Sequence, residues 1–326
     1  MKVLVTGATG FIGSHLTDKL LDEGFDVFCT IRETSSLRRL EGKKINFIKS
    51  ENIFEDKNTG KNTNFDYIFH CAGIVKAKNY SGYEKGNYLL TKRILEETYK
   101  YNPNLKKFIH ISSQAACGPS PDRNPINEEY SPKPITRYGT TKLMAEKEVF
   151  KYKDKFPVVI VRPSAVFGER DNEILMYFKF FNKGINSLIG FGEKYLSLIY
   201  IKDLTEGIFS ASHKETESGE IFFLSSDRQY SWDEISDVTS KILNRKSMKL
   251  RIPHFFLYSA GAVYQFFSLF SKNAPTLNIE KCKDLTQRYW TCSNAKAKRI
   301  LGFRENYTLE QSFRNTINWY KQNKWI

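Results

Sequence analysis

The amino-acid sequence predicts an α/β fold, in which a doubly wound parallel sheet is followed by a smaller, mostly helical lobe towards the C-terminus. Three observations support this prediction. Short apolar runs recur through the first half of the chain, segments with helical spacing separate them, and a glycine-rich turn follows the first run. The runs are apolar throughout, without alternating polar residues, which indicates strands covered on both faces and therefore a parallel sheet.

Six of these runs are predicted to be strands, in the order Lys2–Thr6, Asp26–Ile31, Ile45–Lys49, Tyr67–His70, Phe108–Ser112 and Val158–Val161. The segment after the first run places its apolar residues on one helical face, as an amphipathic helix does. The regular alternation ends near Gly168. Residues 169–200 are aromatic and irregular apart from a strand expected at 197–201. One more strand is expected at 220–224, and the chain after Ser231 is predicted to be mostly helical.

The glycine-rich turn is Thr6-Gly-Ala-Thr-Gly-Phe-Ile-Gly13, between the first strand and the first helix. Gly7 permits a tight turn, Gly10 lets a pyrophosphate approach the backbone, and Gly13 lets the helix pack closely. Free amides at the helix N-terminus would then bind the phosphates. This placement is typical of Rossmann-type dinucleotide binding. The residues expected to contact the cofactor in this turn are Gly7, Thr9, Gly10, Phe11, Ile12 and Gly13.

The domain organisation follows from the turn and from the break near Gly168. We expect residues 1–168, with a contribution from 201–226, to form a Rossmann dinucleotide-binding domain. Residues 169–200 and 227–326 are expected to form a discontinuous lobe that closes over the substrate.

The end of the second predicted strand indicates which dinucleotide is preferred. Arg32 stands about twenty residues after the glycine turn, where an acidic residue would bind the 2′-hydroxyl of NAD. An arginine at this place suits the 2′-phosphate of NADP, and Ser36 lies within reach of the same pocket. We therefore expect NADP(H) to be preferred. NAD(H) stays open as the alternative, because Glu33 could turn inward to bind a ribose hydroxyl.

Three residues have the spacing of an acid–base site. Ser113 stands at the carboxyl end of a central strand, where open α/β sheets bind their ligands. Tyr138 and Lys142 follow, four residues apart on one helical face. A free phenol has a pKa of about 10, and a nearby ammonium favours its ionised form. We expect Tyr138 to exchange a proton with the substrate oxygen, Lys142 to assist it and bind the cofactor, and Ser113 to hold that oxygen.

These motifs occur together over nearly the whole chain, and the sequence resembles the extended short-chain dehydrogenases/reductases, the NAD-dependent epimerase/dehydratase family. The matching segments are TGATGFIGSHL, Cys71-Ala-Gly73, ISSQAACG, YGTTK, RPSAVFG and IYIKDL. The resemblance implies that Ala72 and Gly73 line the cofactor and that Pro163 and Ser164 lie by the nicotinamide. It also implies that Asn87 lies near the active site, where we expect it to contact the substrate.

Departures from the family pattern indicate the substrate class. Nucleotide-sugar enzymes of the family usually have an asparagine where this chain has Ala165, and an arginine where it has Leu196. Each missing contact would cost about 1–3 kcal/mol with a sugar nucleotide. We therefore expect a reductase of the hydroxysteroid dehydrogenase or dihydroflavonol reductase branch, acting on a ketone of a lipid, sterol or terpenoid. A nucleotide-sugar epimerase or dehydratase and a non-catalytic NADP-binding sensor are the alternatives.

The stretch Ile252–Ser271 contains no acidic or strongly basic residue, and Lys249, Arg251 and Lys272 flank it. Its aromatic residues, Phe266 and Phe267 among them, are expected to line a hydrophobic substrate slot. A helix packed in the lobe is one interpretation and a helix dipping into an anionic membrane surface is another. A spanning helix, which needs about 20 apolar residues, is the least favoured.

The composition of the chain limits the partners, metals and cellular location that can be expected. The 326 residues carry a formal net charge of +14, but the lysines are scattered without a run, so no nucleic-acid partner is predicted. The five cysteines form no CxxC pair or zinc-type cluster, which indicates a reducing compartment and no metal. We expect a cytoplasmic protein, with peripheral membrane contact as a variant. The resemblance also implies a homodimer through helices near 83–101 and 138–153.

Overall fold

The computed structural model describes the chain except for residues 52, 55–63, 269, 271–274 and 276. Within the described residues, the main sheet has seven strands in the order β10-β6-β5-β4-β1-β2-β3, and each neighbouring pair is parallel. The predicted fold class is therefore confirmed. The strands are β1 (Lys2–Thr6), β2 (Asp26–Ile31), β3 (Asn46–Lys49), β4 (Tyr67–His70), β5 (Lys107–Ile111), β6 (Val158–Pro163) and β10 (Glu220–Leu224).

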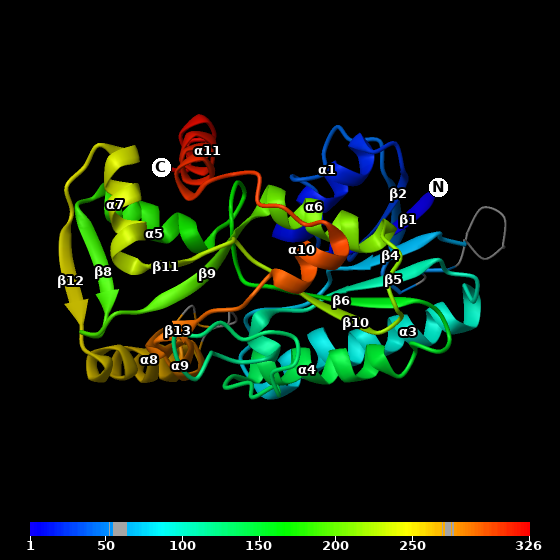
Figure 1. The fold of residues 1–326 in the computed structure, drawn as a ribbon, viewed down its shortest axis with the longest axis horizontal. Helices are drawn as coiled ribbons and strands as arrows, with labels where there is room; N and C mark the ends of the chain where they lie inside the picture. The colour runs from blue at the N-terminus through cyan, green and yellow to red at the C-terminus, as the bar shows by residue number, and fades with distance from the viewer. Residues whose placement is uncertain (52, 55–63, 269, 271–274, 276) are drawn as a thin grey trace.

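Helices cover both faces of this sheet (Figure 1). On one face α1 (Phe11–Asp22) packs beside α6 (Ile201–His213), and on the other α3 (Leu90–Tyr101) packs beside α4 (Arg137–Phe150). A short helix α2 (Tyr80–Tyr83) and a π-helical segment η1 (Glu84–Leu89) lead into α3. The helix expected near 83–101 is therefore not uniformly α-helical.

The alternation of side chains along β1 builds two separate cores. Val3 and Val5 pack with Leu16 of α1, whereas Leu4 packs with Ile94 of α3. Each of these side chains is buried, which explains why the middle of β1 is apolar without alternating polar residues. The core therefore holds the carboxyl ends of β1, β4, β5 and β6 at one edge of the sheet, where the predicted site residues follow.

The second lobe contains structure that local spacing did not predict. Residues 169–200, expected to be irregular, contain α5 (Glu173–Asn182) and β8 (Ile185–Ile189) as well as β9 (Tyr195–Tyr200). The Asp171 carboxylate accepts hydrogen bonds from the backbone amides of Glu173 and Ile174, at 2.8 and 3.0 Å, and so starts α5. Strand β8 pairs with β12 (Met248–Ile252), about sixty residues later, which no local pattern can predict.

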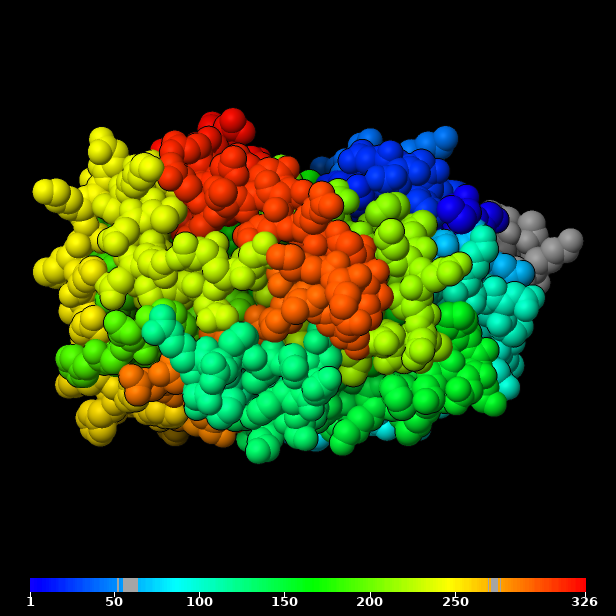
Figure 2. Space-filling view, viewed as in Figure 1, coloured from blue at the N-terminus to red at the C-terminus, as the bar shows by residue number. Residues whose placement is uncertain are grey.

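The rest of the lobe is mostly helical, as expected. Figure 1 shows β9 reaching from the main sheet into the lobe, with α8 and α9 below it. Figure 2 shows the orange segment around α10 lying across the middle of the molecule. The remaining elements are β7 (Ala165–Phe167), β11 (Gln229–Ser231), α7 (Trp232–Leu243), α8 (His254–Ser268), α9 (Ile279–Thr286), β13 (Tyr289–Trp290), α10 (Ala295–Leu301) and α11 (Leu309–Gln322).

Candidate active site

The glycine turn after β1 leaves no room for side chains at two of its positions. Gly7 has a φ of +70°, and a Cβ there would lie 2.7 Å from the backbone of Ala72. A Cβ on Gly13 would lie 2.3 Å from the carbonyl oxygen of Gly7. The amide of Gly10 donates to that same oxygen at 2.9 Å, and no side chain caps α1. The first amides of α1, at Phe11 and Ile12, are therefore oriented as a phosphate site requires.

Two further features fit a bound dinucleotide. The buried hydroxyl of Ser164, directly after Pro163 at the end of β6, has no hydrogen-bond partner within the described residues. Gly73 leaves a narrow space, because a Cβ there would lie 3.0 Å from Asn87 Oδ1 and 3.9 Å from Lys142 Nζ. An unpartnered buried hydroxyl and a cradle without side chains are what a polar ligand entering at this edge would use.

The residues directly after β2, where the choice of dinucleotide is expected to be made, lie at the surface. Arg32 is exposed, and its backbone amide donates to Ser35 Oγ at 3.0 Å, while Ser36 is also exposed. Glu33 is 84% exposed and pairs with Lys49 at 3.6 Å.

Two more arginines, Arg39 and Arg170, lie at the glycine turn. Arg39 donates to the carbonyl oxygen of Thr9 at 3.2 Å and to that of Arg170 at 2.7 Å. Arg170 in turn pairs with Asp18 of α1 at 2.8 Å. Arg39 follows Arg38 in the sequence, and nothing in that pattern distinguishes the arginine that folds back onto the turn.

The structure brings Ser113, Tyr138 and Lys142 together. Ser113 follows β5, and its hydroxyl accepts from the amide of Ala115 at 3.1 Å. Thr136 caps α4 by accepting from the amide of Gly139 at 3.1 Å, which places Tyr138 in the first turn of that helix. Burial raises the pKa of Tyr138 to about 12, and its hydrogen bond with Ser113 acts in the opposite direction. The phenol is therefore protonated at neutral pH.

Lys142 lies one turn further along α4 and is buried. Its ammonium donates to the carbonyl oxygen of Ile111 at 2.7 Å. Burial lowers the pKa of Lys142 to about 8, and the carboxylate of Glu146 opposes this. The pKa of Lys142 therefore lies close to neutral pH.

Glu146, four residues after Lys142 on the same helix face, anchors a buried ion pair. Its carboxylate accepts from Arg162 at 3.0 and 2.7 Å, and also from the hydroxyl of Ser112. All three residues are nearly inaccessible. The sequence analysis missed Glu146, although its spacing from Tyr138 and Lys142 was a usable signal.

Asn87, in the π-helical segment, lies beside this site and braces it. Its Oδ1 accepts from the amide of Ile74 at 2.8 Å, and its two amide hydrogens go to the carbonyl oxygen of Ile74 (3.1 Å) and to Thr141 Oγ1 (3.0 Å). The side chain therefore ties the loop after β4 to α4. Its contact with substrate stays a prediction.

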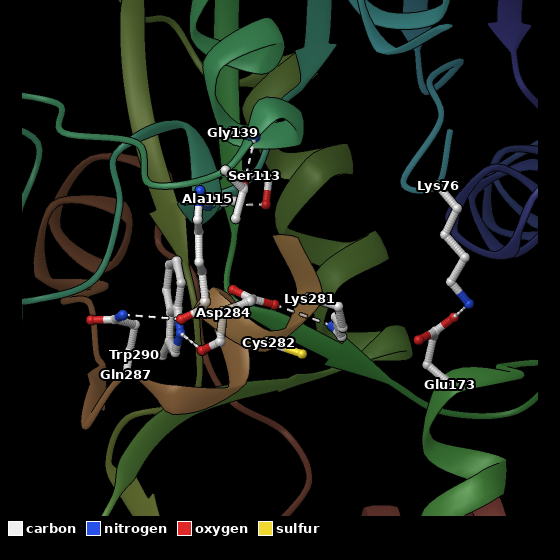
Figure 3. Close-up of polar contacts among 12 residues, drawn as sticks. Lys76, Ser113, Ala115, Gly139, Glu173, Lys281, Cys282, Asp284, Gln287 and Trp290 are labelled. Atoms are coloured by element: carbon white, nitrogen blue, oxygen red, sulfur yellow. Dashed lines mark hydrogen bonds and ion pairs between the residues drawn. The ribbon is translucent and has the colours of Figure 1, made fainter. Parts of the chain in front are cut away.

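Helix α9 brings Asp284 close enough to Tyr138 for its charge to act on the phenol. Figure 3 shows Ser113 and Gly139 on one side and Asp284, Gln287 and Trp290 on the other. The Asp284 carboxylate pairs with Lys281 at 3.1 Å, and its charge adds to the rise in the pKa of Tyr138. These residues were missed because only the tertiary structure places α9 here.

Two contacts join α9 and α5 to the part of the chain that carries the seven-stranded sheet. The carboxylate of Glu280, on α9, accepts from the backbone amide of Arg137 at 2.6 Å. Lys76, in the loop after β4, forms an ion pair with Glu173 of α5 (Figure 3). The first of these contacts is made by the residue directly before Tyr138.

The structure does not bring Phe266 and Phe267 to this site. Both lie on the outer face of α8, 58% and 64% exposed, and the expectation that they line an enclosed slot is wrong. The physical reason is that α8 packs on α9 through its opposite face, at Leu257 and Gly261. Two residues of the apolar stretch, 269 and 271, lie outside the described residues. Among the described helices, none has the length and apolarity that crossing a membrane requires.

Comparisons with known proteins agree with this geometry. Residues 3–225 match the NAD dependent epimerase/dehydratase family. The chain is 28% identical to an uncharacterized UDP-glucose epimerase of Bacillus subtilis, over 76% of this chain and 84% of that protein. It is 24% identical to the mouse decarboxylating sterol-4-alpha-carboxylate 3-dehydrogenase, over 97% of this chain and 90% of that protein.

A solved structure has the same fold. The UDP-glucuronic acid 4-epimerase of Bacillus cereus, in complex with NAD, superposes with a TM-score of 0.76. The match covers 99% of both chains at 24% identity, so it supports the fold alone. With the family match over residues 3–225, this chain belongs to the NAD dependent epimerase/dehydratase family, the extended short-chain dehydrogenases/reductases that its motifs predict.

Proposed function

We propose that this enzyme uses NADP(H) to reduce a ketone on a hydrophobic substrate, or to oxidise the matching secondary alcohol. The observation that carries the proposal is the neutral phenol of Tyr138, hydrogen-bonded to Ser113 and one helical turn from the buried Lys142. A protonated phenol beside a hydroxyl can hold a carbonyl oxygen and supply it with a proton.

In the reductive direction, each of the three residues has its own task. Ser113 donates a hydrogen bond to the substrate oxygen and orients it. Tyr138 transfers its phenolic proton to that oxygen as negative charge develops there. Lys142 stabilises the resulting phenolate, because its ammonium lies on the same face of α4. A bound nicotinamide would supply the hydride, and the glycine turn with Ser164 would hold the dinucleotide.

The preference for NADP(H) rests on the residues after β2. Arg32 is exposed directly after β2, where the 2′-phosphate of a bound dinucleotide could pair with its guanidinium. Glu33 is exposed and faces Lys49 across 3.6 Å at the surface, so its carboxylate points to a lysine rather than to a ribose site. The NAD in the Bacillus cereus complex keeps NAD(H) as the alternative.

The proposal of a hydrophobic substrate rests on two positions whose side chains cannot form hydrogen bonds with a ligand. Ala165 begins β7 and Leu196 lies on the adjacent strand β9, and neither side chain can hold a nucleotide or a diphosphate. The mouse relative acts on a sterol by its name, which supports this reading. The name of the Bacillus subtilis relative favours the second candidate, epimerisation of a UDP-sugar.

A homodimer remains part of the proposal. Exposed apolar side chains lie on the helices that the family uses for pairing: Leu89 at the end of η1, Tyr99 on α3 and Phe150 on α4. Pairing through this face would cover them and leave the catalytic edge free.

A paired assay separates the two candidate functions. NADPH oxidation is followed with a series of methyl ketones of increasing chain length, and binding of UDP-glucose and UDP-glucuronic acid is measured by calorimetry. The proposal expects turnover that rises with chain length and no measurable sugar-nucleotide binding. Micromolar binding of a UDP-sugar, with no ketone turnover, would assign the protein to the epimerases instead.

A further inference from the structure

Helix α8 exposes an unusually apolar face. Within the described residues, its outward side chains are between 54% and 80% exposed, including that of Phe270 just beyond its end, and none of them carries a charge. Monomeric soluble proteins rarely leave so many large apolar side chains together at the surface unless something binds there. The exposed large side chains are Phe255, Phe256, Val263, Tyr264, Phe266, Phe267 and Phe270.

The opposite face of α8 anchors the helix to the lobe. Leu257 and Gly261, one turn apart, are its only buried residues among those described. A Cβ on Gly261 would lie 2.6 Å from Cys282 Sγ, and that thiol donates to the carbonyl oxygen of Leu257 at 3.3 Å. The aromatic face is therefore held outward by close packing on α9.

Basic residues outnumber acidic ones in and around the segments that flank α8. Residues 245–290 contain eight lysines and arginines and two acidic residues, and Lys249, Lys281 and Lys283 form ion pairs with carboxylates. Arg251, the next-to-last residue of β12, lies shortly before α8 and donates to the carbonyl oxygen of Gly190 at 3.3 Å. The guanidinium of Arg288, beyond α9, lies near Gly192 in the same loop after β8. An apolar face with a basic border matches the interface of an anionic bilayer, with acyl chains beneath phosphate headgroups.

We propose that the outer face of α8 docks this enzyme onto anionic lipid membranes. The helix would lie in the plane of the interface, with Phe255, Phe266 and Phe267 inserted among the acyl chains. A second copy of this chain fits less well, because a two-fold interface would bring two identical basic borders against each other. The purpose of docking, access to a substrate dissolved in the bilayer, rests on the proposed function, whereas docking itself requires no catalysis.

The test is vesicle co-sedimentation without cofactor or substrate. Vesicles of phosphatidylcholine are compared with vesicles in which a quarter of the lipid is phosphatidylglycerol. The test variant carries Phe255→Ser, Phe266→Ser and Phe267→Ser. A matched control carries Phe47→Ser, Met176→Ser and Phe180→Ser, which are exposed apolar residues outside α8. Thermal unfolding and cofactor binding establish that each variant folds.

We expect the unmodified protein to bind the anionic vesicles more strongly than the neutral ones. The α8 variant should bind them at least about tenfold more weakly, because the inserted apolar area is lost. The control variant and Tyr138→Phe should bind as the unmodified protein does, so a failure of the proposed chemistry leaves this result unaffected. A single Phe267→Asp variant, which places an anion on the face, should also weaken binding.

Three results would overturn the proposal. The first is no binding of the unmodified protein to anionic vesicles. The second is equal binding by the α8 variant and the unmodified protein, which would make the attraction purely one of charge. The third is a dimer in solution that the α8 variant converts to a monomer while the control does not, which would assign this face to a second copy of the chain.

Discussion

Helices α4 and α8 orient their most distinctive side chains in opposite directions, α4 towards the protein interior and α8 towards the surface. Helix α4 turns a row of polar groups inward at four-residue spacing, from Tyr138 to Lys142 to Glu146, and each of these groups has a partner inside the protein. Helix α8 turns a row of aromatic groups outward and buries only Leu257 and Gly261. The polar groups of α4 therefore find all their partners within the chain, whereas the exposed aromatic face of α8 would be covered only by a partner outside it.

The energetics of the two helices differ accordingly. Buried charges are costly unless they are paired, so the contacts around Glu146 must all form together. Exposed aromatic side chains lose favourable burial, but each loss is small and independent of the others. Substitutions on α4 should therefore have large, coupled effects, and substitutions on α8 should leave folding and chemistry nearly unchanged.

The largest effect is expected at Tyr138. Tyr138→Phe removes the proton donor but keeps the ring, so turnover should fall by about two to four orders of magnitude. NADPH binding, measured by fluorescence titration, should stay within about a factor of three, because the glycine turn is unchanged. Near-normal turnover by this variant would mean that the proton comes from another group.

The second-largest effect is expected at the buried ion pair between Glu146 and Arg162. Glu146→Gln leaves Arg162 buried without its anion, and we expect the free energy of unfolding to fall by about 3–5 kcal/mol, measured by urea denaturation. Glu310→Gln, which breaks an exposed ion pair with Lys241, is the matched control and should change stability little. Equal effects of the two substitutions would contradict the contrast between buried and exposed charge.

The depressed pKa of Lys142 predicts a third effect, on the pH dependence of stability. Between a folded pKa of about 8 and its ordinary value of 10.5, the unfolded chain binds more protons at this residue than the folded chain does. Stability contributed by Lys142 should therefore rise with pH across that window, by up to about 1.4 kcal/mol per pH unit. The measurement is the difference in unfolding free energy between the unmodified protein and Lys142→Met, from pH 7 to pH 10.5. A difference that does not change with pH would mean that Lys142 is not desolvated.

The fourth effect is at the surface, after β2. The unmodified protein should bind NADPH at least about tenfold more tightly than NADH, which is about 1.4 kcal/mol. Arg32→Asp should abolish or reverse that preference, whereas Arg38→Asp, at an exposed neighbour, should change it less. Equal affinities for both dinucleotides in the unmodified protein would refute the role of Arg32.

The contrast between α4 and α8 also explains which features of the structure the sequence could predict. The sheet, the glycine turn and the cluster of Ser113, Tyr138 and Lys142 depend on local spacing and on the edge at which parallel strands end. Glu146 follows the same spacing and was accessible to that reasoning. The role of Arg162 as its partner was not, because that contact joins a helix to a strand.

The second lobe escaped prediction for physical reasons. A helix that is apolar all round, such as α8, does not indicate which face packs inward, so Phe266 and Phe267 were assigned to a slot and lie at the surface instead. The placement of Asp284 opposite Tyr138 depends on how α9 docks. The pairing of β8 with β12 depends on residues about sixty positions apart.

The most direct test of the account is transfer of deuterium. The protein is incubated with NADPH deuterated at the transferring position of the nicotinamide and with a long-chain methyl ketone, and the alcohol is analysed by mass spectrometry. We expect one deuterium on the carbinol carbon with the unmodified protein, and a yield lower by about two to four orders of magnitude with Tyr138→Phe. No deuterated alcohol from any ketone, together with epimerisation of a UDP-sugar by the same preparation, would contradict it.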